Sequence, residues 1–194
     1  MQFPLNFTFK ITTITNDFRV QDATGQEVAF VRQKLLKLKE EIQVFNDESR
    51  SVLNFTIKAN KWLDFSAAYI FYNQDKEIGR IVRRGWKSIW KASYEIYDEN
   101  QNADFTIHEE NALTKVFDSI LGEIPLIGLF TGYFFNPSYI VSRPDGTLIA
   151  RLQKEKSFFC RRFSVNKLAE LESGEENRIL LGLMMMILLE RQRG

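Results

Sequence analysis

The stretch ILLGLMMMILL, residues 179–189, contains neither a charged nor a polar side chain. Leucine and methionine dominate it, and both are strong helix formers, so the stretch predicts an α-helix. A helix that is apolar on every side has to be surrounded by other atoms on every side. Eleven helical residues extend only about 16 Å, whereas a membrane span needs about 20 apolar residues. The sequence therefore predicts a helix buried in the protein core.

The rest of the chain predicts the strands that could surround such a helix. Alternating apolar and polar residues recur with turn residues between them, which is the pattern of antiparallel strands. Helices are also predicted over 111–121 and around 166–173. The expected strands are 4–10, 17–22, 28–33, 41–46, 52–59, 67–73, 77–83, 93–98, 103–108, 138–143, 148–153 and 160–165.

An internal repeat groups these strands. Three segments, beginning at Phe18, Tyr69 and Tyr139, each hold an aromatic strand, an Asx or Gly turn, a second strand, a basic stretch and a third strand. The second strand of each segment carries a small residue: Ala29, Gly79 or Ala150. Repetition of an antiparallel unit favours a meander that closes into a barrel. We expect a mainly β fold, a closed antiparallel barrel of about twelve strands whose lumen is filled by the C-terminal helix.

Composition restricts the class of protein. The chain has 194 residues, 44% of them hydrophobic and 26% charged, with a net charge of +1, which predicts one globular domain over 1–194. A net charge this close to zero creates no overall electrostatic attraction to nucleic acid. The N-terminus does not resemble a signal peptide. The lone Cys160 excludes an intramolecular disulfide, and Cys160 and His108 carry no recognisable catalytic motif. We expect a cytoplasmic protein that is not an enzyme and has no cofactor.

The repeated units and the terminal helix resemble the tubby C-terminal superfamily, in its LURP-one-related and phospholipid scramblase branches. The segments that carry the resemblance are EVAFVRQKLLKLKEEIQVFND, KEIGRIVRRGWKSIWKASYEIYD, TLIARLQKEKSFFCRRFSV and RILLGLMMMILL. The resemblance implies a twelve-stranded barrel around a central hydrophobic helix. It also implies association with membrane lipids, because tubby domains bind phosphoinositide head groups and scramblases are linked to calcium-dependent lipid movement. LURP-one-related proteins have no settled biochemical activity, and fold alone does not fix function.

Basic and aromatic residues gather in three stretches, KLLKLK (34–39), RIVRRGWKSIWK (80–91) and KEKSFFCRR (154–162). Lysine and arginine attract anionic head groups, and tryptophan favours the depth of those head groups. These stretches predict a surface for anionic lipid at the inner face of a membrane. The alternative is that they are solvated outer positions of the strands. The candidate lipid-binding residues are Lys34, Lys37, Arg80, Arg83, Arg84, Trp86, Lys87, Trp90, Lys91, Lys154 and Lys156.

DENQNADFTIHE (98–109) has the oxygen-ligand spacing of a calcium loop. Ala103 stands where such a loop requires glycine, and the flanks predict strands instead of helices. An Asx-rich hairpin turn is the alternative, and we expect no tight metal site. The candidate ligands are Asp98, Asn100, Asn102, Asp104 and Glu109.

Three hypotheses for function follow. The first is a non-enzymatic module that binds anionic phospholipid head groups. The second is a barrel that binds other proteins or serves a structural role. The third is a carrier that holds a small molecule in its lumen, which the central helix disfavours because it would occupy that space. Protein partners and oligomeric state are not encoded in any motif of this chain.

Overall fold

A computed structural model describes residues 1–11, 15–34, 41–60, 68–84, 93–110, 138–155 and 160–191. All twelve predicted strands are confirmed, and so is the terminal helix α2 (Glu175–Arg191). The predicted helix at 111–121 lies outside the described residues. The strands are β1 (Leu5–Ile11), β2 (Thr15–Gln21), β3 (Glu27–Lys34), β4 (Glu41–Phe45), β5 (Leu53–Asn60), β6 (Ala68–Asn73), β7 (Lys76–Arg84), β8 (Ser93–Tyr97), β9 (Ala103–Glu110), β10 (Ser138–Ser142), β11 (Leu148–Glu155) and β12 (Cys160–Lys167).

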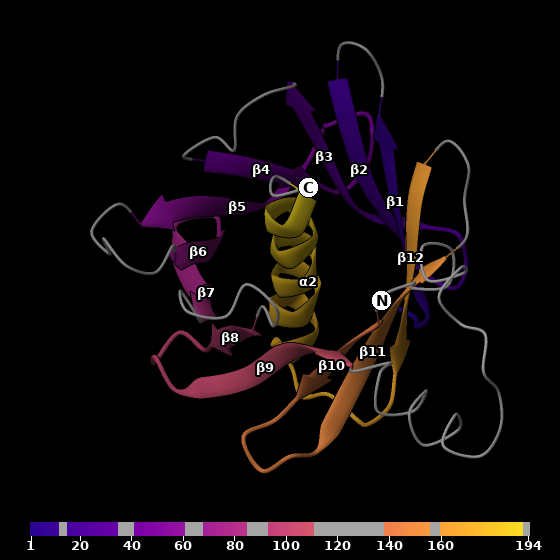
Figure 1. Cartoon of the computed structure of the whole chain (residues 1–194). Helices are drawn as coiled ribbons and strands as arrows, with labels where there is room; N and C mark the ends of the chain where they lie inside the picture. Colours follow the sequence, from indigo (N-terminus) through magenta and orange to yellow (C-terminus); the bar gives the residue numbers. More distant parts are fainter. Residues whose placement is uncertain are drawn as a thin grey trace, which may run out of the picture.

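The strands form a closed antiparallel barrel (Figure 1). Each strand pairs with its neighbours in sequence, and β1 also pairs with β12, with Leu5 opposite Val165. Each described strand thus has a paired neighbour on both sides, although β3 and β4 are joined by a single pair, Phe30 opposite Phe45.

The internal repeat has a structural counterpart. The three repeated segments form β2–β4, β6–β8 and β10–β12. In each segment the small residue of the second strand pairs with the last residue of the first strand before a shift in register, and the extra residue of this β-bulge lies in the second strand. A bulge bends its strand and increases the local twist, so the repeat bends the sheet at three corresponding places. The paired residues are Val20 and Ala29, Phe71 and Gly79, and Val141 and Ala150.

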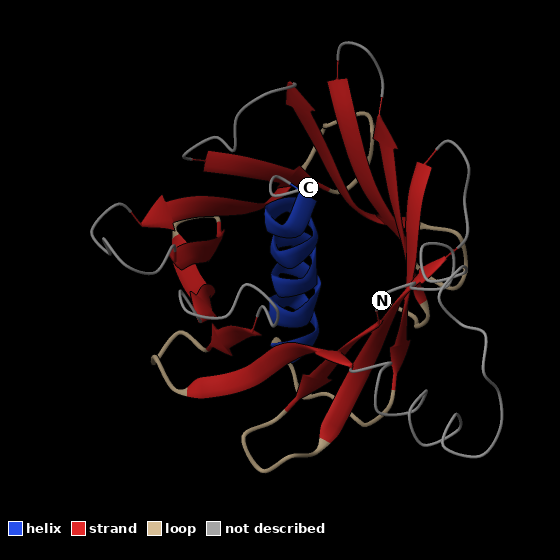
Figure 2. Ribbon diagram, in the orientation of Figure 1, coloured by secondary structure: helices blue, strands red, loops and turns tan. Residues whose placement is uncertain are grey.

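Helix α2 runs through the barrel (Figure 2). Residues 179–188 are all buried, and Ile187 is the most exposed of the hydrophobic side chains among them, at 6%. Among the described residues, no helix is long and apolar enough to cross a bilayer. The apolar stretch that lacks a polar face is therefore a core helix, as its composition predicted.

The helix lies closest to β7 and β8, and glycines permit the close approach. A Cβ atom added to Gly182 would lie 2.4 Å from Ile96 Cδ1. Phenylalanines fill other parts of the core: Phe18 makes edge-to-face contacts with Phe7 and Phe9 at centroid separations of 5.7 and 5.8 Å. Small residues on one side of the helix and large aromatic residues on β1 and β2 together pack the lumen.

The predicted helix around 166–173 is wrong. β12 continues to Lys167, and the N–H groups of Leu168 and Ala169 both donate to the carbonyl of Ile149. Leucine, alanine and glutamate favour a helix locally, but pairing with β11 satisfies the backbone here instead. The chain then turns at Gly174, where φ is +89°.

Two ion pairs fix the first turns of α2. Arg178 Nε donates to Asp104 Oδ2 at 2.6 Å, and Arg143 Nη2 donates to Glu175 Oε2 at 2.8 Å. Glu175 is buried, and its carboxylate also accepts the Glu172 N–H, which caps the helix. Burial raises the pKa of Asp104, and the hydrogen bond and charge of Arg178 only partly offset that effect. These contacts join α2 to β9 and to the β10–β11 hairpin.

Replacing Gly79 by alanine is expected to destabilise the protein. Its φ of +146° is strained for other residues, and the new Cβ would lie 2.5 Å from the Tyr97 carbonyl oxygen and 2.7 Å from Arg178 Cδ. The conformation alone costs about 1–3 kcal/mol in free energy of unfolding, and the crowding adds to it. Urea denaturation measures the loss.

Gly25→Ala is the matched control for Gly79→Ala. Gly25 also has a positive φ, +83°, but nothing lies within 4 Å of the Cβ that alanine would add. We expect Gly25→Ala to lose less stability than Gly79→Ala. Equal losses would mean that the close approach of β7 to β8 and α2 contributes nothing.

Candidate functional site

The strands that lead into the three basic stretches all finish at one end of the barrel. In this closed antiparallel ring all odd-numbered strands run in the same direction. β3, β7 and β11 are odd, and they carry or lead into the basic stretches at 34–39, 80–91 and 154–162. We call this end, where odd strands finish, the basic end. α2 begins at the opposite end and runs back through the lumen toward the basic end (Figure 1).

Two of the candidate arginines are outward-facing and paired with acids. Arg80 Nη2 donates to Glu77 Oε1 at 2.7 Å. Arg84 donates to Glu95 Oε2 and to the Tyr97 hydroxyl, each at 2.9 Å, and the Tyr97 hydroxyl makes a short hydrogen bond to Glu95.

These contacts shift both partners of the Arg84 pair. The hydrogen bond from Arg84 to Tyr97, followed by the contacts with Glu95, raises the pKa of Arg84. Burial alone would raise the pKa of Glu95, but hydrogen bonds with Tyr97 and Arg84 and the charge of Arg84 hold it below its usual value. The charge of Arg84 is therefore compensated within the protein.

Two other candidate cations occupy inward register positions. Arg83 follows Gly79 and Ile81, which are buried, on the same face of β7. Its guanidinium lies 6.0 Å from the centroid of the Tyr94 ring, and its buried Nε has no hydrogen-bond partner. Lys154 follows Ala150 and Leu152 in the same way on β11. Within the described part of the chain, neither Arg83 nor Lys154 forms an ion pair.

The remaining candidates are Lys34 and six residues beyond the described segments. Only the backbone of Lys34, the last residue of β3, is described. The other candidate lipid-binding residues lie outside the described residues: Lys37, Trp86, Lys87, Trp90, Lys91 and Lys156.

The opposite end of the barrel, which we call the acidic end, differs sharply in charge. It consists of the β-turns at 22–26, 46–52, 73–76, 98–102 and 143–147, together with the segment 168–178. These segments carry eleven acidic residues: Asp22, Asp47, Glu48, Asp75, Asp98, Glu99, Asp145, Glu170, Glu172, Glu175 and Glu176. They carry four basic residues: Arg50, Lys76, Arg143 and Arg178.

The candidate calcium ligands lie in and beside the β8–β9 turn. Asp98 Oδ1 accepts the N–H groups of Asn100 and Asn102, and Asp98 Oδ2 accepts the Asn102 side-chain amide. Burial would raise the pKa of Asp98, but these hydrogen bonds hold it below its usual value. Asp104 lies in β9, paired with Arg178, and Glu109 is exposed farther along the same strand. Both carboxylate oxygens of Asp98 are thus occupied by hydrogen bonds that stabilise the β8–β9 turn.

We predict no calcium binding tighter than a dissociation constant of about 10 μM, the weak limit of sensor sites. Among the described residues, no group of three or more His, Cys, Asp or Glu side chains is arranged to hold a metal. Isothermal titration with calcium tests the prediction. Tighter binding that disappears in Asp98→Ala would contradict it.

Sequence reasoning missed the acidic end and its ion pairs. Arg178 and Asp104 are 74 residues apart in the chain, and no local pattern joins them. The predicted strand order could have located this end. In a closed antiparallel barrel, every connection from an even-numbered strand to the next odd-numbered strand lies at the same end.

A model of the LURP-one-related family matches residues 27–169, which is more than half of the chain and includes all three basic stretches. An Arabidopsis thaliana protein of known X-ray structure superposes with a TM-score of 0.50 and 9% identity, over 99% of this chain and 93% of that one. Such low identity shows a shared fold alone. The search of curated proteins finds no match. The family model, supported by the barrel and its central helix, assigns this chain to the LURP-one-related family.

Proposed function

We propose that this LURP-one-related barrel is a non-enzymatic module that binds anionic phospholipid head groups through its basic end. The observation that supports the proposal is the strand order, in which β3, β7 and β11, the strands that lead into the three basic stretches, finish at the same end of the barrel. A juxtaposed group of lysines and arginines attracts the negative surface of a bilayer by about 1 kcal/mol per residue. The protein would then be peripheral to the inner face of a membrane.

The charge of the connecting segments supports this orientation. The segments between odd and following even strands, with the tail 192–194, contain eight Lys or Arg residues and four Asp or Glu residues in the sequence. The acidic end has the reverse imbalance, eleven acidic to four basic. An anionic surface therefore attracts one end of the barrel and repels the other.

The candidate cations do not contribute equally to this proposal. Arg80 and Arg84 are paired with Glu77 and Glu95, so a lipid phosphate would have to compete with these carboxylates. Arg83 has no carboxylate partner in the described part of the chain, and a phosphate could accept from the terminal nitrogens of its guanidinium, since Nε itself is buried. We therefore assign more of the binding to Arg83 and Lys154 than to Arg80 and Arg84.

The alternatives have less support. A carrier needs a lumen open to its ligand, whereas α2 and buried phenylalanines occupy the lumen here. A protein-binding barrel without lipid affinity remains the principal competitor, and the vesicle experiment separates it from the lipid hypothesis.

The test is co-sedimentation with vesicles of phosphatidylserine and phosphatidylcholine. We expect binding to the anionic vesicles that falls as salt rises, because exposed charges are screened over about 8–10 Å at physiological ionic strength. The variant Arg83→Gln/Lys87→Gln/Lys154→Gln should lose up to about 3 kcal/mol of binding free energy. Its melting temperature is recorded alongside, so that loss of fold is not mistaken for loss of affinity.

The matched control removes three positive charges near the opposite end, in Arg50→Gln/Lys76→Gln/Lys167→Gln. This variant has the same net charge as the test variant but should retain vesicle binding. Negligible binding of the unmodified protein to both kinds of vesicle would reject the lipid hypothesis. Equal losses in the two variants would reject the basic end as the binding surface.

A further inference from the structure

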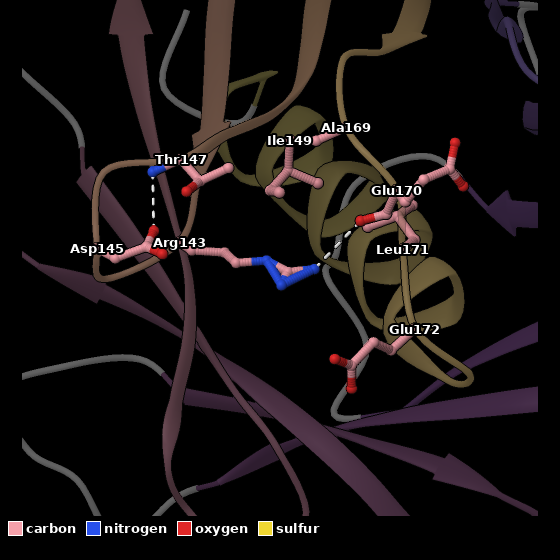
Figure 3. A pocket seen from close by; sticks show the side chains of 8 residues that line it. All are labelled: Arg143, Asp145, Thr147, Ile149, Ala169, Glu170, Leu171 and Glu172. Atoms are coloured by element: carbon pink, nitrogen blue, oxygen red, sulfur yellow. Dashed lines mark hydrogen bonds between the residues drawn. The ribbon is translucent and has the colours of Figure 1, made fainter.

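A groove opens at the acidic end, between the β10–β11 hairpin and the segment that leads into α2 (Figure 3). Its volume is about 320 Å³, at the lower limit of small-molecule sites. Ile149, Ala169 and Leu171 supply its apolar lining, and Asp145 and Glu172 stand on its two sides. We propose that this groove binds a protein segment that carries a lysine or arginine beside an aliphatic side chain.

Two exposed leucines lie next in sequence to apolar lining residues of the groove. Leu148 precedes Ile149 and is 47% exposed, and Leu168 precedes Ala169 and is 46% exposed. The Leu168 N–H donates to the Ile149 carbonyl at 2.8 Å, so the two stretches lie side by side.

Charge around the groove selects a basic partner. The Glu172 side chain is exposed and forms no ion pair within the described part of the chain. Glu170 pairs with Lys167, but its side chain is 92% exposed, so solvent weakens that pair. The Thr147 N–H donates to Asp145 Oδ1 at 2.9 Å, and this hydrogen bond lowers the pKa of Asp145.

Arg143 does not oppose a basic partner, because its charge is already compensated. Its side chain extends across the groove toward the Glu170 main chain (Figure 3), and Nη2 donates to the Glu170 carbonyl at 3.3 Å. The same nitrogen donates to the buried Glu175 carboxylate at 2.8 Å. Arg143 therefore holds the hairpin and the helix-leading segment together and leaves a surplus of negative charge at the rim.

The groove is built on fixed backbone, so it exists before a partner arrives. Ile149 accepts two backbone hydrogen bonds from the segment opposite, and the Glu172 N–H is held by Glu175. A preformed surface spares a partner part of the ordering cost of binding. The inference does not depend on lipid binding, since the groove lies at the end of the barrel opposite the basic one.

A selection of random short displayed peptides on the immobilised full chain tests the inference. We expect enrichment of peptides that combine lysine or arginine with leucine, isoleucine or valine. Amide chemical shifts in the unmodified protein should move at 147–149 and 168–172 when such a peptide is added. Selection of acidic peptides, or of none above background, would overturn the proposal.

The groove variant Leu148→Ser/Leu168→Ser/Glu172→Arg changes exposed side chains only and should fold. It should weaken the selected peptides by at least about tenfold in dissociation constant. The control Val52→Ser/Leu53→Ser/Asp75→Arg makes the same changes on exposed residues elsewhere at the acidic end, and it should retain the affinity. Unchanged affinity in the groove variant, with shifts outside the groove, would also overturn the proposal.

Discussion

A chain that ends after Gly174, and so lacks α2, is expected to be insoluble or molten. Residues 179–188 are buried inside the barrel, and their removal would expose the core side chains of β1, β7, β8 and β9 to water. Deleting one buried leucine or isoleucine side chain costs about 2–5 kcal/mol, and whole domains have about 5–15 kcal/mol of stability. The loss of the whole helix is therefore expected to cost more than the total free energy of unfolding of the domain.

Expression yield in the soluble fraction and thermal melting by circular dichroism measure the result. A chain that ends after Arg191 is the control, because it keeps α2 whole and should melt cooperatively. A membrane-anchor role for residues 179–189 predicts the opposite outcome, in which the truncated chain becomes more soluble and keeps its fold. A soluble, cooperative truncation would therefore refute the role of α2 as core.

Met185→Lys is expected to prevent folding. The Met185 side chain is fully buried in the middle of α2, and no carboxylate lies in the apolar stretch around it. An unpaired ammonium in such a place costs several kcal/mol even after relaxation, or the lysine must lose its proton. Leu183→Ala and Ile187→Ala should each cost about 2–5 kcal/mol and leave a weakened fold.

Two controls separate position from chemistry in this experiment. Met185→Leu keeps the site apolar at similar volume and should cost less than about 1.5 kcal/mol. Leu168→Lys introduces the same charge at an exposed position and should stay within about 0.5 kcal/mol. Urea denaturation gives all the free energies of unfolding, and a cooperative transition for Met185→Lys near that of the unmodified protein would contradict the prediction.

The barrel was predictable from two local patterns, the alternation of apolar and polar residues in the strands and the uninterrupted apolar run of the terminal helix. Strands with one face in the core alternate with period two, and the helix at 179–189 breaks that alternation with a run that only a surrounded helix can bury. The segment after β12 was not predictable in this way. Its leucine, alanine and glutamate residues suit a helix, and only hydrogen bonds to Ile149, contributed by a distant strand, decide against it.

The candidate site was partly predictable. The three basic stretches are visible in the sequence, and the strand count gives the common end at which the strands that lead into them finish. The inward position of Arg83 could also have been predicted from the alternation of β7, because the apolar Ile81 precedes it by two residues. A count of basic residues does not distinguish inward from outward positions. The pairing of Arg84 with Glu95 and the groove around Ile149 depend on register and on long-range contacts, which no local pattern specifies.

Pairing of β1 with β12 has a consequence for how the chain folds. Leu5 must meet Val165 before the ring is complete, so ring closure joins residues that are far apart in sequence. Such long-range pairing slows folding, because loop entropy is lost before the contacts form. Until then the unpaired sides of β1 and β12 are open to other chains. We therefore expect slow, concentration-sensitive refolding, in which yield falls as protein concentration rises.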